Sequence, residues 1–372
     1  MKVGIITYHN VINYGAVLQA LALQESIKEL GGEPEIINYT PIKIFSVYKP
    51  FSIFRYKRIY KMGFKRVLRA IASDVKHGVS ITLKNKGFSD FENKYYNYSG
   101  NSFEDFNKNK KHLLNYDVCF TGSDQVWNPD ITYGFDDAYF LRFGKEDMIR
   151  ASYAASIGRE NFSENEKVQL KDYLKDFNYI SLRESTAAGV LSPLTDKDLK
   201  VVLDPTLLLS AEKWKSLLGI EDNKEKYIFV YTLYPNPELN KFVEKLSKQK
   251  NIPVITLNGK KIYSNESARY LRANPQKFVE LVANASYVVT NSFHGTAFSV
   301  NFSKNFYTFL GESRNSRITD LLTKLNIPHR AVKKCSDELL EESDIDYASV
   351  QQILSCEREK SIGYIKNVLE GK

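Results

Sequence analysis

The chain has 372 residues, 43% hydrophobic and 13% aromatic, which excludes a disordered protein and suggests about two packed domains. Its formal net charge is +8, but segment 43–86 holds 12 Lys or Arg against the single acid Asp74. The rest of the chain is therefore net negative, and the basicity is one local patch.

Three cysteines, Cys119, Cys335 and Cys356, lie far apart and lack metal-ligand spacing. They are expected to be reduced thiols. The chain begins directly in a predicted strand, without the charged and apolar regions of a signal peptide, and no run is long and apolar enough to span a bilayer. We therefore expect a cytoplasmic protein.

Strands and helices are predicted to alternate from the start, with a strand over 2–8, a helix over 16–30 and a strand over 35–39. Further strands are predicted over 116–121, 150–156, 179–182 and 200–203. Such alternation indicates a parallel sheet with helices on both faces.

The basic segment, about 41–112, interrupts this alternation as a predicted helical insertion in which aromatic residues are interleaved. One interpretation is a solvated insertion whose aromatics pack onto the domain. The other is contact with an anionic surface, such as a membrane leaflet or a lipid-linked phosphate. No zinc finger, RNA-binding signature or Gly-rich loop supports a nucleic-acid partner. Aromatic residues interleaved with the basic ones of 43–86 include Tyr48, Phe51, Phe54, Tyr56, Tyr60 and Phe64.

A second series begins after a charged, linker-like stretch, so we expect a domain boundary near 205–225. Strands are predicted over 227–233, 253–257, 287–290 and 306–309, with helices over 238–249, 276–285, 296–302 and 318–325. The predicted domains are an N-terminal Rossmann-like domain, 1–210, a C-terminal Rossmann-like domain, 211–345, and a C-terminal helix within 346–372 that packs back across both.

Two Rossmann-like halves of similar size predict an α/β protein of the glycosyltransferase-B-like layout, with a central cleft between the two domains. Open α/β sheets bind ligands beyond the carboxyl ends of their strands. Polar segments that follow the predicted strands are therefore the candidate site.

The first of these segments contains Asn13 and Gly15 at the start of the first long helix. Gly15 permits close backbone approach, and a helix start offers N–H groups to a phosphate or carboxylate. The alternative is that Asn13 is a plain N-terminal cap. The segment is not GxGxxG, so a nicotinamide cofactor is not indicated.

The second segment contains Ser123, Asp124 and Trp127. We interpret Asp124 as a base or as a ligand of a sugar hydroxyl, and Trp127 as a platform for a sugar face. An Asx-type turn with Trp127 in the core is the alternative.

The third segment contains Arg183, which suits bidentate recognition of a carboxylate or phosphate. The alternative is an ion pair with Glu184 or Asp204.

The fourth segment runs from an apolar strand through Ser292 to His294 at the start of a helix. Helix N-termini favour anions, and histidine moves protons near neutral pH. Arg314 and Arg317, at the start of the next helix, are also placed for an anion. The alternative for His294 is a residue that caps its helix.

No HExxH, cysteine cluster or paired-carboxylate ligand set appears, so no metal is required, and no P-loop or GxSxG elbow is present.

The chain resembles the polysaccharide pyruvyl transferases. The resemblance rests on five blocks in family order, which cover most of the chain outside the basic insertion and the C-terminal tail. These blocks are 13–19 (NYGAVLQ), 122–128 (GSDQVWN), 182–184 (LRE), 204–206 (DPT) and 292–295 (SFHG).

The resemblance implies a transferase that moves the enolpyruvyl carbons of phosphoenolpyruvate onto a sugar as a cyclic ketal, in surface polysaccharide biosynthesis. Phosphoenolpyruvate is then the donor substrate, and no cofactor is needed. Arg183 and His294 are implied donor-site residues, and Asp124 is the candidate base. Many members have an arginine where this chain has Ser292, which leaves Arg314 or Arg317 to replace that charge.

We therefore expect a cytoplasmic pyruvyltransferase acting on a lipid-linked or nucleotide-linked saccharide, held at the inner face of the membrane by 43–86. The alternatives are a glycosyltransferase that uses a nucleotide sugar and a non-catalytic assembly protein that binds sugar phosphates.

Overall fold

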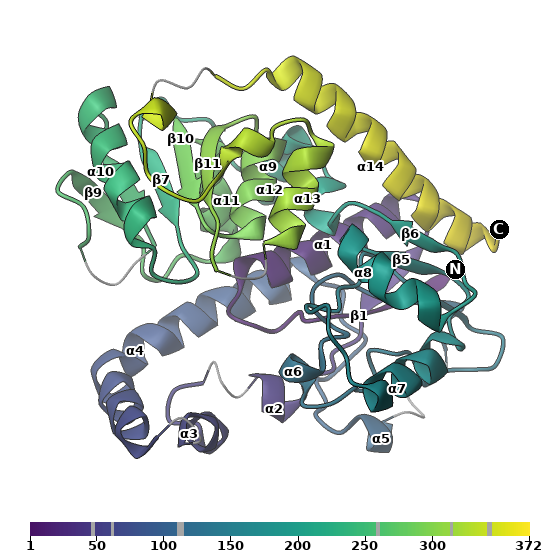
Figure 1. The fold of residues 1–372 in the computed structure, drawn as a ribbon. Helices are drawn as coiled ribbons and strands as arrows, with labels where there is room; N and C mark the ends of the chain where they lie inside the picture. Colours follow the sequence, from purple (N-terminus) through teal and green to yellow (C-terminus); the bar gives the residue numbers. More distant parts are fainter. Residues whose placement is uncertain (46–48, 61–62, 110–114, 258–260, 313–314, 341–343) are drawn as a thin grey trace. The chain divides into compact units, whose positions relative to one another are not determined.

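The computed structural model describes seven stretches of the chain, which fold into two compact units (Figure 1). Unit 1 comprises Met1–Pro205 and Ser361–Lys372, and unit 2 comprises Thr206–Lys360. The described stretches are 1–45, 49–60, 63–109, 115–257, 261–312, 315–340 and 344–372.

Unit 1 is built on parallel strands in the order β2-β1-β3-β4. The pair β5–β6 continues this sheet through isolated bridges from Ala151 to Tyr179 and from Ala155 to Leu182. Because helices cover a parallel sheet on both faces, its central strands are apolar throughout, as the fully buried β3 shows. The strands are β1 (Lys2–Ile6), β2 (Glu33–Ile36), β3 (Val118–Thr121), β4 (Ile149–Ser152), β5 (Ile180–Leu182) and β6 (Leu199–Val201).

Two of the helices that pack on the sheet of unit 1 begin at caps encoded in the sequence. Asn13 caps α1 (Tyr14–Glu29), and Ser163 with Glu166 forms a capping box at α7 (Glu164–Leu174). A long buried face of α1 lies in the core. The predicted alternation of strands and helices is therefore present in unit 1. It continues with α8 (Ser185–Leu191), which follows β5.

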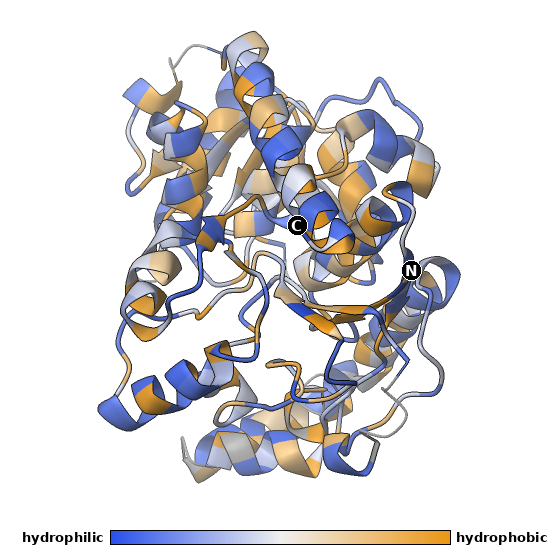
Figure 2. Cartoon of the chain, turned by 90° about the vertical axis from the view of Figure 1, so that its right-hand side faces the viewer, coloured by the Kyte–Doolittle hydropathy of each residue, from blue (hydrophilic) through white to orange (hydrophobic). Residues whose placement is uncertain are grey.

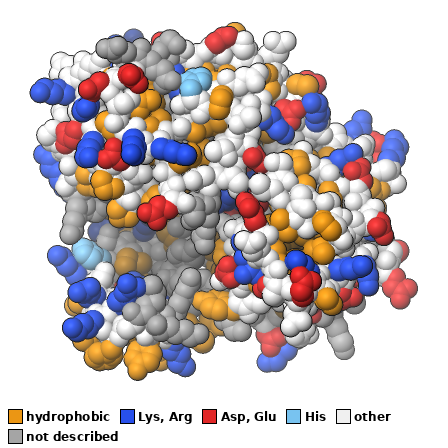
Figure 3. Space-filling model, in the orientation of Figure 1, with side chains coloured by type: hydrophobic (Ala, Val, Ile, Leu, Met, Phe, Trp, Pro, Cys, Tyr) orange, Lys and Arg blue, Asp and Glu red, His pale blue; other side chains and the backbone are white. Residues whose placement is uncertain are grey.

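The basic segment is helical, as predicted, and its described part contains α2 (Ile42–Phe45), α3 (Ile53–Tyr60), α4 (Phe64–Tyr95) and α5 (Phe106–Asn109). The last turns of α4 are anchored on α1. Tyr96 Oη donates to the carbonyl of Val17 at 2.7 Å, and Gln24 Nε2 donates to the carbonyl of Tyr95 at 2.9 Å. Lys and Arg side chains gather with hydrophobic ones over α3 and α4, at the lower left of Figure 3.

A buried carboxyl in α4 makes the stability of the protein depend on pH. Burial raises the pKa of Glu92 to about 8, although a hydrogen bond from Tyr98 Oη, 3.3 Å away, opposes the shift. The folded state therefore keeps a proton that the unfolded chain releases above about pH 4.5. As pH rises from about 5 to 8, we expect a loss of about 3 kcal/mol from the free energy of unfolding.

Urea unfolding across this pH range checks the expectation. Glu92→Gln should flatten the profile and make the protein more stable than the wild type at pH 8. Asp90→Asn, on the exposed side of the same helix, should keep the wild-type slope. An unchanged slope in Glu92→Gln would mean that another group titrates.

Unit 2 contains a parallel sheet in the order β12-β11-β10-β7-β8-β9. Two of its strands were not predicted. β9 is a polar edge strand that lacks the continuous apolar run of a central strand, and β12 pairs only two residues with β11. The strands are β7 (Ile228–Tyr231), β8 (Val254–Thr256), β9 (Glu266–Arg269), β10 (Tyr287–Thr290), β11 (Asn305–Phe309) and β12 (Ala331–Val332).

Each of three helices in unit 2 begins with a capping side chain. Asn236 and Asn274, followed by proline, cap α10 (Pro237–Lys250) and α11 (Pro275–Ala283), and Ser210 caps α9 (Ala211–Leu218). The remaining α-helices are α12 (Phe293–Asn301), α13 (Ser316–Lys324) and α14 (Tyr347–Glu370).

The C-terminal helix α14 contributes to both units. Its Arg358 donates to the carbonyl of Leu207 at 2.8 Å in unit 2, and its Tyr364 donates to the carbonyl of Ser152 at 2.9 Å in unit 1. Orange and blue residues are mixed along this helix, which ends at the label C in Figure 2. None of the helices within the described stretches has the length and apolar character needed to cross a bilayer.

Candidate functional site

The strand order of unit 1 has a topological switch point at the carboxyl ends of β1 and β3. The chain leaves β1 through α1 to β2 on one side, and later adds β3 on the other side of β1. Such a reversal of strand order opens a crevice beyond the carboxyl ends of the two strands. Asp124 follows β3 at this point, and the start of α1 follows β1.

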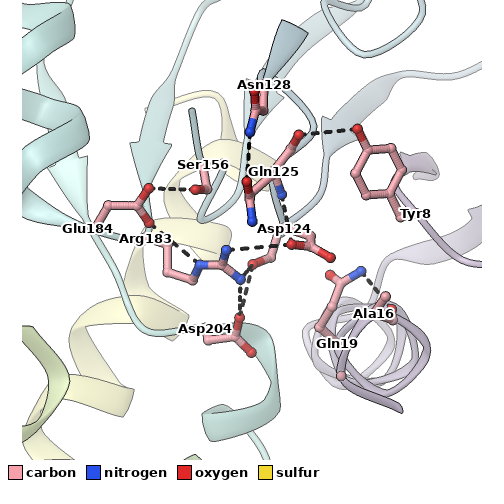
Figure 4. A network of polar contacts seen from close by, with 12 residues as sticks. Tyr8, Ala16, Gln19, Asp124, Gln125, Asn128, Ser156, Arg183, Glu184 and Asp204 are labelled. Carbon is pink, nitrogen blue, oxygen red and sulfur yellow. Dashed lines mark hydrogen bonds and ion pairs between the residues drawn. The ribbon is translucent and has the colours of Figure 1, made fainter. Parts of the chain in front are cut away.

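Arg183 is the centre of a buried polar cluster beside this switch point (Figure 4). It follows β5, and its side chain is 2% exposed. Nη1 lies 3.1 Å from Asp204 Oδ2 and 3.3 Å from Ser123 Oγ, and Ser123 Oγ donates to the same Asp204 oxygen at 3.0 Å. Nη2 lies 3.7 Å from Asp124 Oδ1, and Nε lies 3.6 Å from Glu184 Oε2.

The electrostatics of the cluster hold Arg183 in its charged form. Burial alone lowers the pKa of Arg183, but the carboxylates of Asp204, Glu184 and Asp124 outweigh it and raise the pKa above its ordinary value. The ion pairs with Glu184 and Asp204 are the ones expected under the alternative interpretation of Arg183, in which it pairs with neighbouring carboxylates. The guanidinium thus faces three carboxylates, and the predicted contact of Arg183 with a donor remains a prediction.

Asp124 is the member of the cluster that follows β3 at the switch point. Its backbone φ is 80°, in the left-handed region that few residues other than glycine adopt but that aspartate tolerates. Oδ1 accepts the N–H of Gln125 at 2.8 Å and faces Arg183. Among the described residues, no polar contact is made by Oδ2, which is drawn without a dashed line in Figure 4. One carboxylate oxygen is thus oriented, and the Asp124 side chain as a whole is 13% exposed.

Three residues predicted to bind the donor have structural roles in unit 1. Asn13 Oδ1 accepts the N–H groups of Gly15 at 3.0 Å and of Ala16 at 3.4 Å, so Asn13 is the N-cap of α1. The N–H of Gly15, predicted to be offered to a ligand, is therefore already hydrogen-bonded within the protein. Ser123 is fully buried in the Arg183 cluster. Their predicted contact with a donor remains a prediction.

The interpretation of Trp127 as a platform for a sugar is wrong. The indole is fully buried, and its N–H donates to the carbonyl of Tyr139 at 3.0 Å. Its ring stacks on Phe140, with 5.3 Å between centroids and 7° between planes. The segment 138–143 covers it, so Trp127 belongs to the core.

Ser156 and Gly158, which follow β4, also lie in this part of unit 1 and were not singled out from the sequence. Ser156 Oγ donates to Glu184 Oε1 at 2.5 Å, which orients Glu184 toward Arg183. Gly158 has a φ of 69°, in the left-handed region that favours glycine, and it lies against the side chains of Gln125 and Asn128. Their position after a strand was the available signal, but these small residues resemble an ordinary turn.

Unit 2 has a topological switch point of the same kind. The chain leaves β7 through α10 to β8 on one side, and later enters β10 on the other side. His294 is the second residue of α12, which starts at the carboxyl end of β10. The structure therefore places His294 at a topological switch point and at a helix N-terminus, two features that favour an anionic ligand.

The turn before His294 is held by hydroxyl groups. Thr290 Oγ1 donates to the carbonyl of Tyr231 at 2.6 Å and accepts the N–H of Ser292 at 3.0 Å. Ser292 Oγ accepts the N–H of Gly295 at 3.3 Å and caps α12. A Cβ on Gly295 would lie 2.4 Å from Thr290 Oγ1, so the helix can start this close to β10 only with glycine there.

Arg317 lies beside this turn. Its guanidinium carbon is 5.9 Å from the ring centroid of Phe293, and that ring meets the imidazole of His294 edge-on at 5.2 Å. The first turn of α13 thus brings a cation close to the start of α12. Arg314 lies outside the described residues. On the other side, Asn291 accepts the N–H of Leu233 at 2.7 Å and so fixes the loop after β7.

The two Rossmann-like units define an α/β protein of the glycosyltransferase-B-like class, as predicted. A protein assigned as a UDP-N-acetylglucosamine 2-epimerase from Listeria monocytogenes has a similar structure, with a TM-score of 0.51 and 9% identity over 100% of this chain and 97% of that chain. The UDP-GlcNAc 2-epimerase from Neisseria meningitidis bound to UDP-GlcNAc gives a TM-score of 0.49 and 9% identity, over 99% of this chain and 97% of that one. At 9% identity, the similarity to the Listeria protein shows the fold alone.

Residues 13–313 match the family model of the polysaccharide pyruvyl transferases. The chain belongs to the polysaccharide pyruvyl transferase family, and the predicted resemblance is confirmed. The family indicates a transferase of polysaccharide biosynthesis. No curated protein matches the chain in sequence.

Proposed function

We propose that this transferase moves the enolpyruvyl carbons of phosphoenolpyruvate onto a saccharide and closes a cyclic pyruvate ketal across two hydroxyls. The observation that carries the proposal is the position of the family block 292–295, which places His294 at the switch point of unit 2 with Arg317 beside it. Phosphoenolpyruvate brings a phosphate and a carboxylate, and such a donor needs cations and helix N–H groups.

The chemistry proceeds through an oxocarbenium-like centre at C2 of the donor. A proton is added to the methylene carbon C3, a sugar hydroxyl oxygen bonds to C2, and the C2–O bond breaks to release inorganic phosphate. The second hydroxyl then attacks C2 and loses its proton, which completes the ketal. We assign His294 as the acid or the phosphate ligand, and Asp124, whose Oδ1 is held by the N–H of Gln125, as the base on the acceptor hydroxyl.

We assign Arg183 to positioning in this reaction, because its guanidinium is surrounded by Asp124, Glu184 and Asp204. The arginine that many family members have at position 292 is here a serine that caps α12. Arg317 supplies a cation near that point, and we propose it as the replacement for the missing charge.

Replacing Arg317 by methionine is expected to raise the KM for phosphoenolpyruvate about tenfold, because a charge-assisted contact to the donor is lost. Initial rates at varied donor concentration measure this effect. Arg272→Met, an exposed arginine of the same unit, is the control and should leave KM unchanged. An unchanged KM in Arg317→Met would assign the replacement charge elsewhere.

Incubation of the full chain with phosphoenolpyruvate and candidate acceptors tests the function. We expect inorganic phosphate to be released only when an acceptor is present, and the acceptor to gain the mass of pyruvate less one water. His294→Ala should abolish both signals. Turnover only with a nucleotide sugar, or no turnover with any donor, would contradict the proposal.

We also propose that the acceptor is lipid-linked or nucleotide-linked, and that segment 43–86 holds the enzyme at an anionic membrane surface. The support is the local charge of this segment, with 12 basic residues against one acid.

A further inference from the structure

Helix α3 and the first turns of α4 form a hairpin, here called the docking arm (residues 53–60 and 64–83), in which the only acid is turned inward. Asp74 has a fully buried side chain. Its carboxylate accepts the N–H of Phe51 at 3.0 Å and the hydroxyl of Tyr56 at 2.7 Å, and it pairs with Arg55. This network ties α3 to α4 and leaves no carboxylate on the outside of the described part of the arm.

The outer side of α4 carries a row of exposed apolar side chains. The row residues are three or four positions apart, so they lie along one side of the helix. Val75 and Val79 are 73% and 75% exposed, although valine is a residue usually found in cores. The apolar row consists of Phe64, Leu68, Ile71, Val75 and Val79.

Cations flank this row. Lys65, Arg69 and Lys76 are exposed on the turns that carry the row, and α3 adds exposed Ile53 and Tyr60. A helix with an apolar side and a basic side lies in the plane of an anionic bilayer, where the apolar side enters the acyl boundary and the cations meet the headgroups. Charge complementarity therefore selects an anionic lipid surface as the occupant of this face.

The arm extends from the edge of the sheet that carries the candidate acceptor site. Phe88 of α4 contacts Tyr14, the first residue of α1, with 5.1 Å between ring centroids, and the ammonium of Lys84 lies 5.2 Å from the same Tyr14 ring. Later residues of α4 run along α1 toward its C-terminus. Residues 64–83 therefore continue about 30 Å past the start of α1, on the side where the strands end (Figure 1).

We propose that the docking arm inserts its apolar row into an anionic membrane leaflet and thereby presents the carboxyl edge of the unit 1 sheet, with Asp124, to a lipid-linked saccharide. This inference deepens the proposed function and rests on it for the identity of the acceptor. The attachment itself is independent of catalysis, because the arm contains none of the residues assigned to the reaction.

Sedimentation with vesicles tests the attachment without donor or acceptor. The full chain should bind vesicles that contain phosphatidylglycerol and should bind pure phosphatidylcholine at least about tenfold more weakly. Raising NaCl from about 0.05 M to about 0.5 M should weaken the binding, because the Debye length shortens to about 4 Å.

A charge on the apolar row should remove the binding. Val75→Asp/Val79→Asp is expected to weaken vesicle binding at least about tenfold, since it replaces inserted side chains by carboxylates. Val168→Asp, on α7 of the same unit, is the matched control because Val168 is 69% exposed but has no such row around it, and it should bind as the wild type. Circular dichroism should show the same fold in all three proteins.

A fluorescent reporter distinguishes insertion from adsorption. Both native tryptophans, Trp127 and Trp214, are fully buried, so their emission should not respond to vesicles, and any shift on vesicle addition comes from the added indole. Emission of Val79→Trp should shift to the blue when phosphatidylglycerol vesicles are added, and emission of Val168→Trp should not. Binding without this shift would overturn the insertion.

Three other results would overturn the proposal. They are equal binding to both lipids at all salt concentrations, a dimer in sedimentation equilibrium that Val75→Asp/Val79→Asp dissociates, and binding to single-stranded RNA but not to vesicles. Turnover on a soluble acceptor should be the same in Val75→Asp/Val79→Asp as in the wild type. Vesicle binding without any pyruvyl transfer would contradict the proposed function and leave the docking arm intact.

Discussion

Replacing His294 by alanine is expected to lower turnover at least ~10²-fold, the scale of a lost proton transfer or of lost charge stabilisation. The imidazole is the second residue of α12, at the end of β10, where helix N–H groups and the switch point of unit 2 favour an anion. Phosphate release at saturating donor and acceptor measures turnover. The free energy of unfolding is measured alongside turnover, because His294 is buried and its ring packs edge-on against Phe293.

His329→Ala is the control, because His329 is an exposed histidine of the same unit, and it should retain wild-type turnover. A His294→Asn variant that keeps the activity would show that the side chain acts as a hydrogen-bond donor rather than as an acid. Full activity in His294→Ala would remove the residue from the site.

Replacing Arg183 by methionine is expected to destabilise unit 1 by about 3–5 kcal/mol, because it leaves buried carboxylates without their counter-ion. Asp204 is fully buried, and the guanidinium that faces it is 2% exposed. Removing the second charge as well, in Arg183→Met/Asp204→Asn, should recover part of the loss. Denaturant unfolding at neutral pH measures all three proteins.

An exposed pair gives the reference for this effect. Lys167→Met breaks a surface contact with Glu164 and should cost less than about 1 kcal/mol. If Arg183→Met were as stable as Lys167→Met, the ion pairs of Arg183 would not contribute the expected loss of about 3–5 kcal/mol to the free energy of unfolding. Because Arg183 faces Asp124, turnover of Arg183→Met at a temperature where it is folded should fall through kcat, whereas loss of a donor contact would raise KM.

The chain order of strands and helices could be predicted because each element carries its own pattern. The buried stripe of α1, the apolar run of β10 and the serine that caps α12 are local signals. The polar edge strand β9 has no such signal, because its residues form a strand only through pairing with β8.

The residues of the candidate site also divide into those whose position could be predicted from the sequence and those whose role could not. His294 could be located from its neighbours in sequence, since a strand, a turn and a small-residue helix fix a histidine at a strand end. The role of Trp127 could not, because its indole is covered by Tyr139 and Phe140, whose position depends on a loop that follows. Arg183 could be placed at a strand end, but its partner Asp204 follows a different strand.

The sequence by itself determined the alternating α/β architecture, the family, the basic character of segment 43–86 and the strand-end position of His294, because these follow from local periodicity and short motifs. Only the tertiary structure decided that Arg183 is enclosed by three carboxylates, that Trp127 is core, and that Asp74 turns inward and leaves an apolar, cationic outer face. These outcomes depend on contacts between distant residues, and burial converts the same side chain from a ligand-binding group into a structural one.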